Sequence, residues 1–96
     1  MKKYVFLYVG LGDGGEGAMK AWHDWFESVG EKFVDSGNPF GAGREVSANG
    51  SSDLALDNSA ITGYSIVNVD SLEEAEALAK GCPTVPSVRV YEALPM

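Results

Sequence analysis

The sequence predicts an α+β domain in which an antiparallel sheet carries two helices on one face. Strand-like and helix-like segments follow one another in the order strand, helix, strand, strand, helix, strand, which is the ferredoxin-like βαββαβ arrangement. The chain has 96 residues and is 45% hydrophobic, as expected of one globular unit with its own core. We therefore treat residues 1–96 as a single domain.

The first part of the chain predicts one strand and one helix. Residues 3–9 are β-branched and aromatic, which is typical of a central strand. A glycine-rich loop follows, and the helix is expected to begin near Gly17 and to end near residues 36–37, because Pro39 prevents it from resuming. Its apolar residues recur at steps of four, three and four, which places them on one helical face: Trp22, Phe26, Val29 and Phe33.

The middle of the chain predicts a hairpin over residues 43–57. Asn49-Gly50 is the preferred pair for a tight type I′ turn. The segments on either side of this pair are short and polar. We therefore expect the hairpin at an edge of the sheet.

The last third of the chain predicts a strand, a capped helix and a final strand. Residues 61–69 are the strongest strand signal in this region. Ser71 is the expected N-cap of the helix, with Glu74 completing a capping box, and the glycine and proline within residues 81–83 end it. The final strand is expected over residues 85–91.

Alternation along the strands divides their side chains between two faces of the sheet. One set is small and branched and is expected to pack under the helices: Val5, Leu7, Val9, Val67, Val69, Val88 and Val90. The opposite set is aromatic and contains all four tyrosines of the chain: Tyr4, Phe6, Tyr8, Tyr64, Ile66, Arg89 and Tyr91.

An aromatic sheet face is not expected to remain in water, where polar side chains would alternate with apolar ones. We therefore expect a homodimer in which two such faces pack together and bury the rings. This packing either forms an interface without a ligand or leaves a cavity for a small molecule. The cavity would be lined by Tyr4, Tyr8, Tyr64, Arg89 and Trp22.

Charge and cysteine content exclude several classes of partner. The 7 basic and 14 acidic residues give a net charge of -7, which repels nucleic acids and anionic membrane surfaces. No apolar run is long enough to cross a bilayer. Cys82 is the only cysteine, so an internal disulfide is excluded and a reducing cytoplasm is expected. The position of Cys82 between a helix and Pro83 favours a buried apolar residue over a reactive thiol.

Residues 10–15 match the pattern G-x-G-x-x-G, with Asp35 downstream at a distance suitable for a ribose contact. However, Asp13 and Glu16 put negative charge where a pyrophosphate would lie, and no second parallel strand precedes Asp35. The pattern is therefore interpreted as a glycine-rich loop, and no cofactor is expected.

His23 is the only histidine, and its unperturbed pKa lies near neutral pH. It lies at the edge of the apolar stripe of the first helix, with Glu16 and Glu27 on the same flank. Two interpretations remain open: a general acid or base with a carboxylate beside it, or an ordinary pair on the helix surface. A single histidine with scattered carboxylates has no metal-binding spacing, so no metal site is expected.

Three segments carry a resemblance to a known family: FVDSGNPFGAG at residues 33–43, ITGYSIVNVDSLEEAEALAKGCP at residues 61–83, and VRVYEALPM at residues 88–96. In these segments the sequence resembles the YCII-related family, also called DGPF-domain proteins, of the dimeric α+β barrel superfamily. The middle segment is the most specific of the three. The resemblance implies a small ferredoxin-like dimer whose sheets pack face to face.

Some members of that family carry a histidine and aspartate pair in a pocket, which suggests catalysis. Here His23 lies in the corresponding helix, and Asp35 and Asp57 are the candidate partners. Residues 37–40 (GNPF) stand where the family motif is expected, without its aspartate. Two hypotheses follow: a binding module that holds a small molecule without turnover, or an enzyme that uses His23 with an acid on a small organic substrate.

Overall fold

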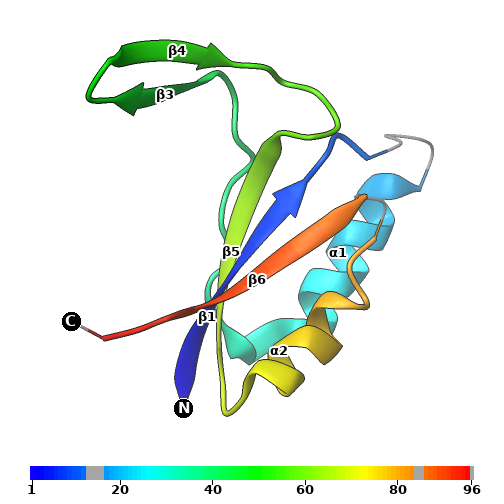
Figure 1. The fold of residues 1–96 in the computed structure, drawn as a ribbon. Helices are drawn as coiled ribbons and strands as arrows, with labels where there is room; N and C mark the ends of the chain where they lie inside the picture. The colour runs from blue at the N-terminus through cyan, green and yellow to red at the C-terminus, as the bar shows by residue number, and fades with distance from the viewer. Residues whose placement is uncertain (13–16, 84–85, 96) are drawn as a thin grey trace.

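The computed structural model describes residues 1–12, 17–83 and 86–95. A four-stranded antiparallel sheet has the order β2-β5-β1-β6, and both helices lie on one side of it (Figure 1). This α+β architecture is compatible with the predicted ferredoxin-like fold. The elements of this layer pair are β1 (Lys2–Val9), α1 (Ala18–Val29), β2 (Phe33–Asp35), β5 (Ile61–Val69), α2 (Leu72–Ala79) and β6 (Ser87–Ala93).

The first helix is shorter than the sequence predicted. It ends at Val29 because Gly30 adopts a φ of 54°, outside the helical region, and donates its N–H to the carbonyl of Phe26. A single 3-10 turn, Gly30–Lys32, follows, and the next three residues form β2 against β5. Phe33 therefore joins the apolar cluster from a strand, although its spacing suggested the helix.

The predicted hairpin is present, but its predicted place at the edge of the sheet is wrong, and so is its predicted turn. Ser47 pairs with Gly50, so the two turn residues are Ala48-Asn49 rather than Asn49-Gly50. β3 (Gly43–Ser47) and β4 (Gly50–Leu54) form a separate two-stranded sheet that projects away from the helices (Figure 1). The edge along β5 is already occupied by β2 and by an isolated bridge between Pro39 and Gly63. The hairpin therefore has no room to pair there.

The second helix and its cap agree with the sequence prediction. The Ser71 hydroxyl accepts the N–H of Glu74 at 3.1 Å, and the Glu74 carboxylate accepts the N–H of Asp70 at 3.0 Å. The predicted start of the last strand, at Val85, and the centre of the glycine-rich loop, at residues 13–16, lie outside the described residues. Within the described part of the chain, no helix is long and apolar enough to cross a membrane.

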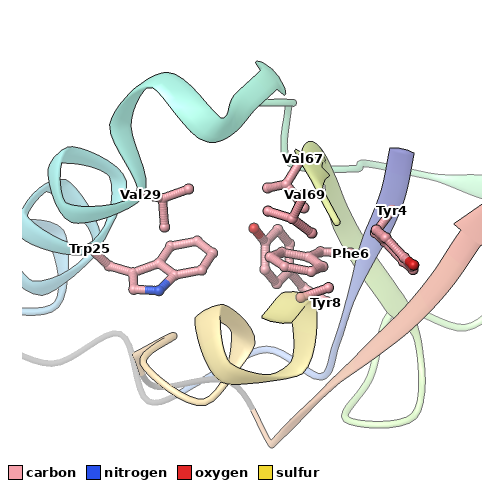
Figure 2. Packing of buried hydrophobic residues seen from close by; sticks show 8 residues of the cluster. Tyr4, Phe6, Tyr8, Trp25, Val29, Val67 and Val69 are labelled. Carbon is pink, nitrogen blue, oxygen red and sulfur yellow. The ribbon is translucent and has the colours of Figure 1, made fainter. Parts of the chain in front are cut away.

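The core lies between the sheet and the helices. Its residues show that the two predicted faces of β1 were interchanged. Tyr4, Phe6 and Tyr8 are buried there with the α1 residues Trp25 and Val29 (Figure 2). In the register of the sheet these β1 residues share a face with the valines of β5 and β6, as Tyr4 pairs with Val67 and Phe6 pairs with Val90.

The opposite face, which no helix of the described chain covers, therefore has a different membership from the one predicted. We call it the open sheet face. Its centre contains Val5, Leu7, Tyr64, Ile66, Arg89 and Tyr91, and the same register adds Lys3, Asn68 and Ala93 toward one end. The error has a physical reason: alternation divides one strand into two sets, but only the register and the bulk needed under the helices decide which set faces inward. The open sheet face is still largely apolar.

Candidate functional site

A groove lies between α1, strand β5 and the chain segment 36–39. Its volume is about 590 Å³, within the range of small-molecule sites. Among the described residues that line it, none has a charged side chain. We call it the aromatic groove, and it is lined by Tyr8, Trp22, Phe26, Ser36, Gly37, Asn38, Pro39, Thr62, Gly63 and Tyr64.

One wall of the aromatic groove comes from α1. Trp22 and Phe26 are four residues apart, so they lie on the same helical face, with ring centroids 5.8 Å apart. The Trp22 ring also meets the edge of Tyr8 at 5.2 Å and 87°. The neighbouring Trp25 is buried and donates its indole N–H to the Leu78 carbonyl at 3.0 Å, which fixes α1 against α2. The aromatic wall is thus held by packing behind it.

The opposite wall is the segment 36–39, which is held against β5 by backbone contacts. The N–H of Tyr64 donates to the Asn38 carbonyl at 3.3 Å, and the Asp35 carboxylate accepts the N–H of Gly37 at 2.9 Å. Gly37 has a φ of 87°, and a Cβ atom there would lie 1.6 Å from the Tyr64 carbonyl oxygen. This close approach requires glycine.

The floor of the aromatic groove is tied together by hydroxyl groups. Tyr8 donates to Ser65 Oγ at 2.7 Å, and Ser65 donates to the Ser36 carbonyl at 2.6 Å. Thr62 Oγ1 donates to the Gly10 carbonyl at 2.7 Å. Burial also raises the pKa of the Tyr8 hydroxyl above its ordinary value, so Tyr8 is neutral near pH 7. The hydroxyl groups of the floor therefore donate their hydrogen bonds to other groups of the protein. The groove presents mainly ring surface to a ligand.

Three of the five predicted ligand-binding residues line the aromatic groove: Tyr8, Trp22 and Tyr64. Tyr4 does not, because it is 1% exposed and belongs to the core. Arg89 lines a second groove on the open sheet face instead.

Phe26, the segment 36–39, Thr62 and Gly63 also line the aromatic groove but were not among the predicted ligand-binding residues. Phe26 stands on the same apolar stripe as Trp22, so its helical spacing was an available signal. The segment 36–39 had no local signal, since its position depends on long-range pairing with Gly63 and Tyr64.

The candidate catalytic residues lie in separate places. The His23 side chain is 71% exposed, and its Nε2 lies 3.5 Å from Glu27 Oε1 on the same helix. Asp35 accepts the Tyr64 hydroxyl at 2.9 Å. Asp57 accepts the hydroxyl and the N–H of Ser59, and these bonds lower the pKa of its carboxyl group. Among the described residues, no hydrogen bond or ion pair joins His23 to either aspartate.

Two further predictions concern Cys82 and metal ligands. Cys82 is half-buried, and burial raises the pKa of its thiol from 9.0 to about 12. The thiol is therefore protonated at neutral pH, which agrees with the predicted unreactive residue. In residues 1–12, 17–83 and 86–95, no group of three or more histidine, cysteine, aspartate or glutamate side chains could hold a metal ion.

In comparisons with known proteins, no family model matches the chain and no curated protein matches it. The fold and the groove therefore define the class of this protein. It is a small α+β domain with an aromatic-lined groove between α1, β5 and the segment 36–39, whose described lining carries no charge.

Proposed function

We propose that the protein binds a small, uncharged and largely apolar molecule in the aromatic groove. The observation that carries this proposal is the lining itself, in which the described residues combine the rings of Tyr8, Trp22 and Phe26 with no charged side chain. A charged ligand would lose its hydration there without gaining an opposite charge, whereas an apolar ring gains contact with three rings.

The polar part of the ligand is expected at the segment 36–39. Ser36 and Asn38 are exposed lining residues whose side chains carry hydrogen-bonding groups. They would orient one polar edge of the ligand, while its apolar part lies against Trp22. This arrangement supports a binding module better than a reaction centre.

A fluorescence titration tests the proposal. The neutral probe N-phenyl-1-naphthylamine is expected to bind saturably, with enhanced emission and energy transfer from tryptophan. The anionic probe 1-anilinonaphthalene-8-sulfonate has a similar ring system and is expected to bind at least about fivefold more weakly, because its charge has no partner in the groove. Equal or tighter binding of the anionic probe would contradict an uncharged ligand.

Variants on α1 locate the probe. Trp22→Ala is expected to weaken binding of the neutral probe at least about tenfold, and Trp22→Phe less, since a ring is retained. Met19→Ala is the matched control, because Met19 is 88% exposed on the same helix and does not line the groove. Far-UV circular dichroism confirms that each variant is folded. Unchanged affinity in folded Trp22→Ala would overturn the proposed site.

We also propose that the chain is a member of the YCII-related family and forms a homodimer through the open sheet face. The strand order β2-β5-β1-β6 supports a βαββαβ core with the β3–β4 hairpin as an insertion. Half-buried Val5, Leu7 and Ile66 on a face without helices support a covered surface, as in a dimeric α+β barrel. Sedimentation should give twice the chain mass at micromolar concentration, and a monomeric mass would reject the dimer.

No observation on the described residues favours the acid–base enzyme as a second function. His23 does not line the aromatic groove, and its imidazole approaches the carboxylate of Glu27 on an exposed helix surface. A catalytic base should reach the bound substrate, and this geometry does not bring it there.

A further inference from the structure

The β3–β4 hairpin projects from the domain as an arm, and little of the rest of its own chain packs against it. All ten of its strand residues are exposed, and it projects to the side of the sheet away from the helices (Figure 1). An isolated two-stranded hairpin is marginally stable in water, so a further packing partner is expected.

The exposed area of the whole chain points to a partner of substantial size. A folded monomer of 10.2 kDa is expected to expose about 5,300 Å², whereas this chain exposes 6622 Å². Its radius of gyration is 14.4 Å, against about 12.5 Å for a compact domain of this length. The excess of about 1,300 Å² exceeds the roughly 800 Å² that each partner buries in a standard interface.

The hairpin and the open sheet face enclose an apolar corner. This second groove has a volume of about 640 Å³. Its floor includes Leu7 and Arg89 of the sheet, and its wall includes Glu45 and Leu54 of the hairpin. Gly43 pairs with Leu54 and Glu45 pairs with Ser52, so these residues share the inner face of the hairpin. Arg44 and Val46 alternate to its outer face.

The distribution of charge favours a second copy of this chain at the corner. The chain carries a net charge of -7, so two copies repel each other over most approaches. Both helices are net acidic: α1 carries Asp24 and Glu27 against Lys20, and α2 carries three glutamates. The hairpin strands and the open sheet face of β1, β5 and β6 carry three basic residues, Lys3, Arg44 and Arg89, against two acidic ones, Glu45 and Asp53. Arg44 is already paired with Asp53 at 3.2 Å, so acidic charge does not predominate on this side. This side is therefore where like chains approach with least repulsion.

We propose that the hairpin packs against a second copy of the chain, whose sheet packs on the open sheet face. We call this contact between the hairpin and the second copy the clasp. Packed sheets lie about 10 Å apart, and a five-residue strand spans about 17 Å. The arm is therefore long enough to pass the edge of a second sheet and to place its inner face, with Glu45 and Leu54, against that copy. In a two-fold dimer both arms do this, so each chain is gripped once.

This inference rests on the proposed homodimer, and one pair of hairpin variants separates the two. Leu54→Lys puts a charge on the inner face of the hairpin, where Leu54 is 53% exposed, and is expected to weaken the dimer at least about tenfold. Val46→Lys is the matched control on the outer face of the same hairpin, where Val46 is 78% exposed, and should change the dimer constant less than about threefold.

Analytical ultracentrifugation measures these dimer constants, and Ile66→Lys on the open sheet face is the reference that breaks any face-to-face dimer. If Ile66→Lys dissociates the dimer and Leu54→Lys does not, the clasp is wrong and the dimer stands. If the unchanged chain is monomeric at micromolar concentration, both the clasp and the dimer are wrong. Probe binding in the aromatic groove is measured separately on the same variants.

A mixed-label experiment places the arm directly. A nitroxide is attached at Val46→Cys in a Cys82→Ser chain, which is mixed with an isotope-labelled chain that carries no nitroxide. Selective broadening of the amide signals of the open sheet face in the labelled chain would support the clasp. Broadening confined to the helices α1 and α2, or none at a concentration where the dimer is populated, would overturn it.

Discussion

The hydroxyl of Tyr8 donates a 2.7 Å hydrogen bond to the hydroxyl of Ser65, which joins β1 to β5 beneath the helices. Ser65 is completely buried, and its own hydroxyl donates a hydrogen bond to the carbonyl of Ser36 at 2.6 Å. Tyr8 belongs to the core and Ser36 to the wall of the aromatic groove. Core stability and groove shape therefore depend on the same buried serine.

Ser65→Ala is expected to destabilise the protein by about 1–3 kcal/mol, because it leaves the buried Tyr8 hydroxyl without its acceptor. Urea unfolding followed by tryptophan fluorescence measures this loss. Adding Tyr8→Phe removes the unpaired hydroxyl. The double variant should therefore lose less free energy of unfolding than the sum of the losses in the two single variants. If Ser65→Ala lowers the free energy of unfolding by less than about 0.5 kcal/mol and the losses of the two single variants add, the hydrogen bond between Tyr8 and Ser65 contributes little.

Gly37→Ala tests the wall of the aromatic groove. Gly37 has a φ of 87°, and a Cβ there would lie 1.6 Å from the Tyr64 carbonyl, so the segment 36–39 must move away from β5. We expect a loss of more than about 2 kcal/mol of stability and weaker binding of the neutral probe.

Gly41→Ala is the matched control for Gly37→Ala. An added Cβ at Gly41 would meet no atom within 4 Å, so the unfolding midpoint and the probe affinity should both stay near those of the unchanged chain. Equal behaviour of the two alanine variants would contradict the close approach of the segment 36–39 to Tyr64.

The types of most elements were predictable because local chemistry determines them. The Ser71 and Glu74 capping box and the β-branched run of β5 each act within a few residues. The hairpin was also predicted, but its turn is Ala48-Asn49, one residue before the predicted Asn49-Gly50 pair. The end of α1 was predicted too late, because Phe33 continues the apolar spacing of the helix although Gly30 has already ended it. The core position of Trp22 and Phe26 agreed with their helical spacing.

The site was predictable only in part, because it depends on contacts between distant segments. The ring residues Tyr8 and Trp22 had signals in their own strand and helix, but the segment 36–39 is placed by its bridge to Gly63. The faces of β1 were assigned wrongly because alternation does not say which set meets the helices. The register resolved this, since Tyr4 stands beside Val67 on the helical side.

Stability should decline in alkaline solution. Burial raises the pKa of the Cys82 thiol from 9.0 to about 12 and raises the pKa of the Tyr8 hydroxyl above 10.0. Both groups are neutral in the folded chain, while the unfolded chain ionises at the lower, ordinary values. Their contribution to stability is therefore complete below about pH 9 and is lost as pH rises toward the folded pKa values.

Urea midpoints measured between pH 7 and pH 11 check this alkaline decline. The midpoint should fall above about pH 9, and Cys82→Ala should reduce the slope of that fall, because its thiol no longer titrates. A midpoint that stays constant to pH 11 would contradict the buried, neutral state of Cys82 and Tyr8.

His23→Gln separates the binding module from the acid–base enzyme. The His23 side chain is 71% exposed and contacts Glu27, and it does not line the aromatic groove. Glutamine keeps a polar side chain at this position but cannot act as an acid or a base near pH 7. The affinity for N-phenyl-1-naphthylamine should therefore stay within about twofold of the unchanged chain, and stability within about 0.5 kcal/mol. A large loss of affinity in His23→Gln, with Met19→Ala unaffected, would return His23 to the site and favour the enzyme hypothesis.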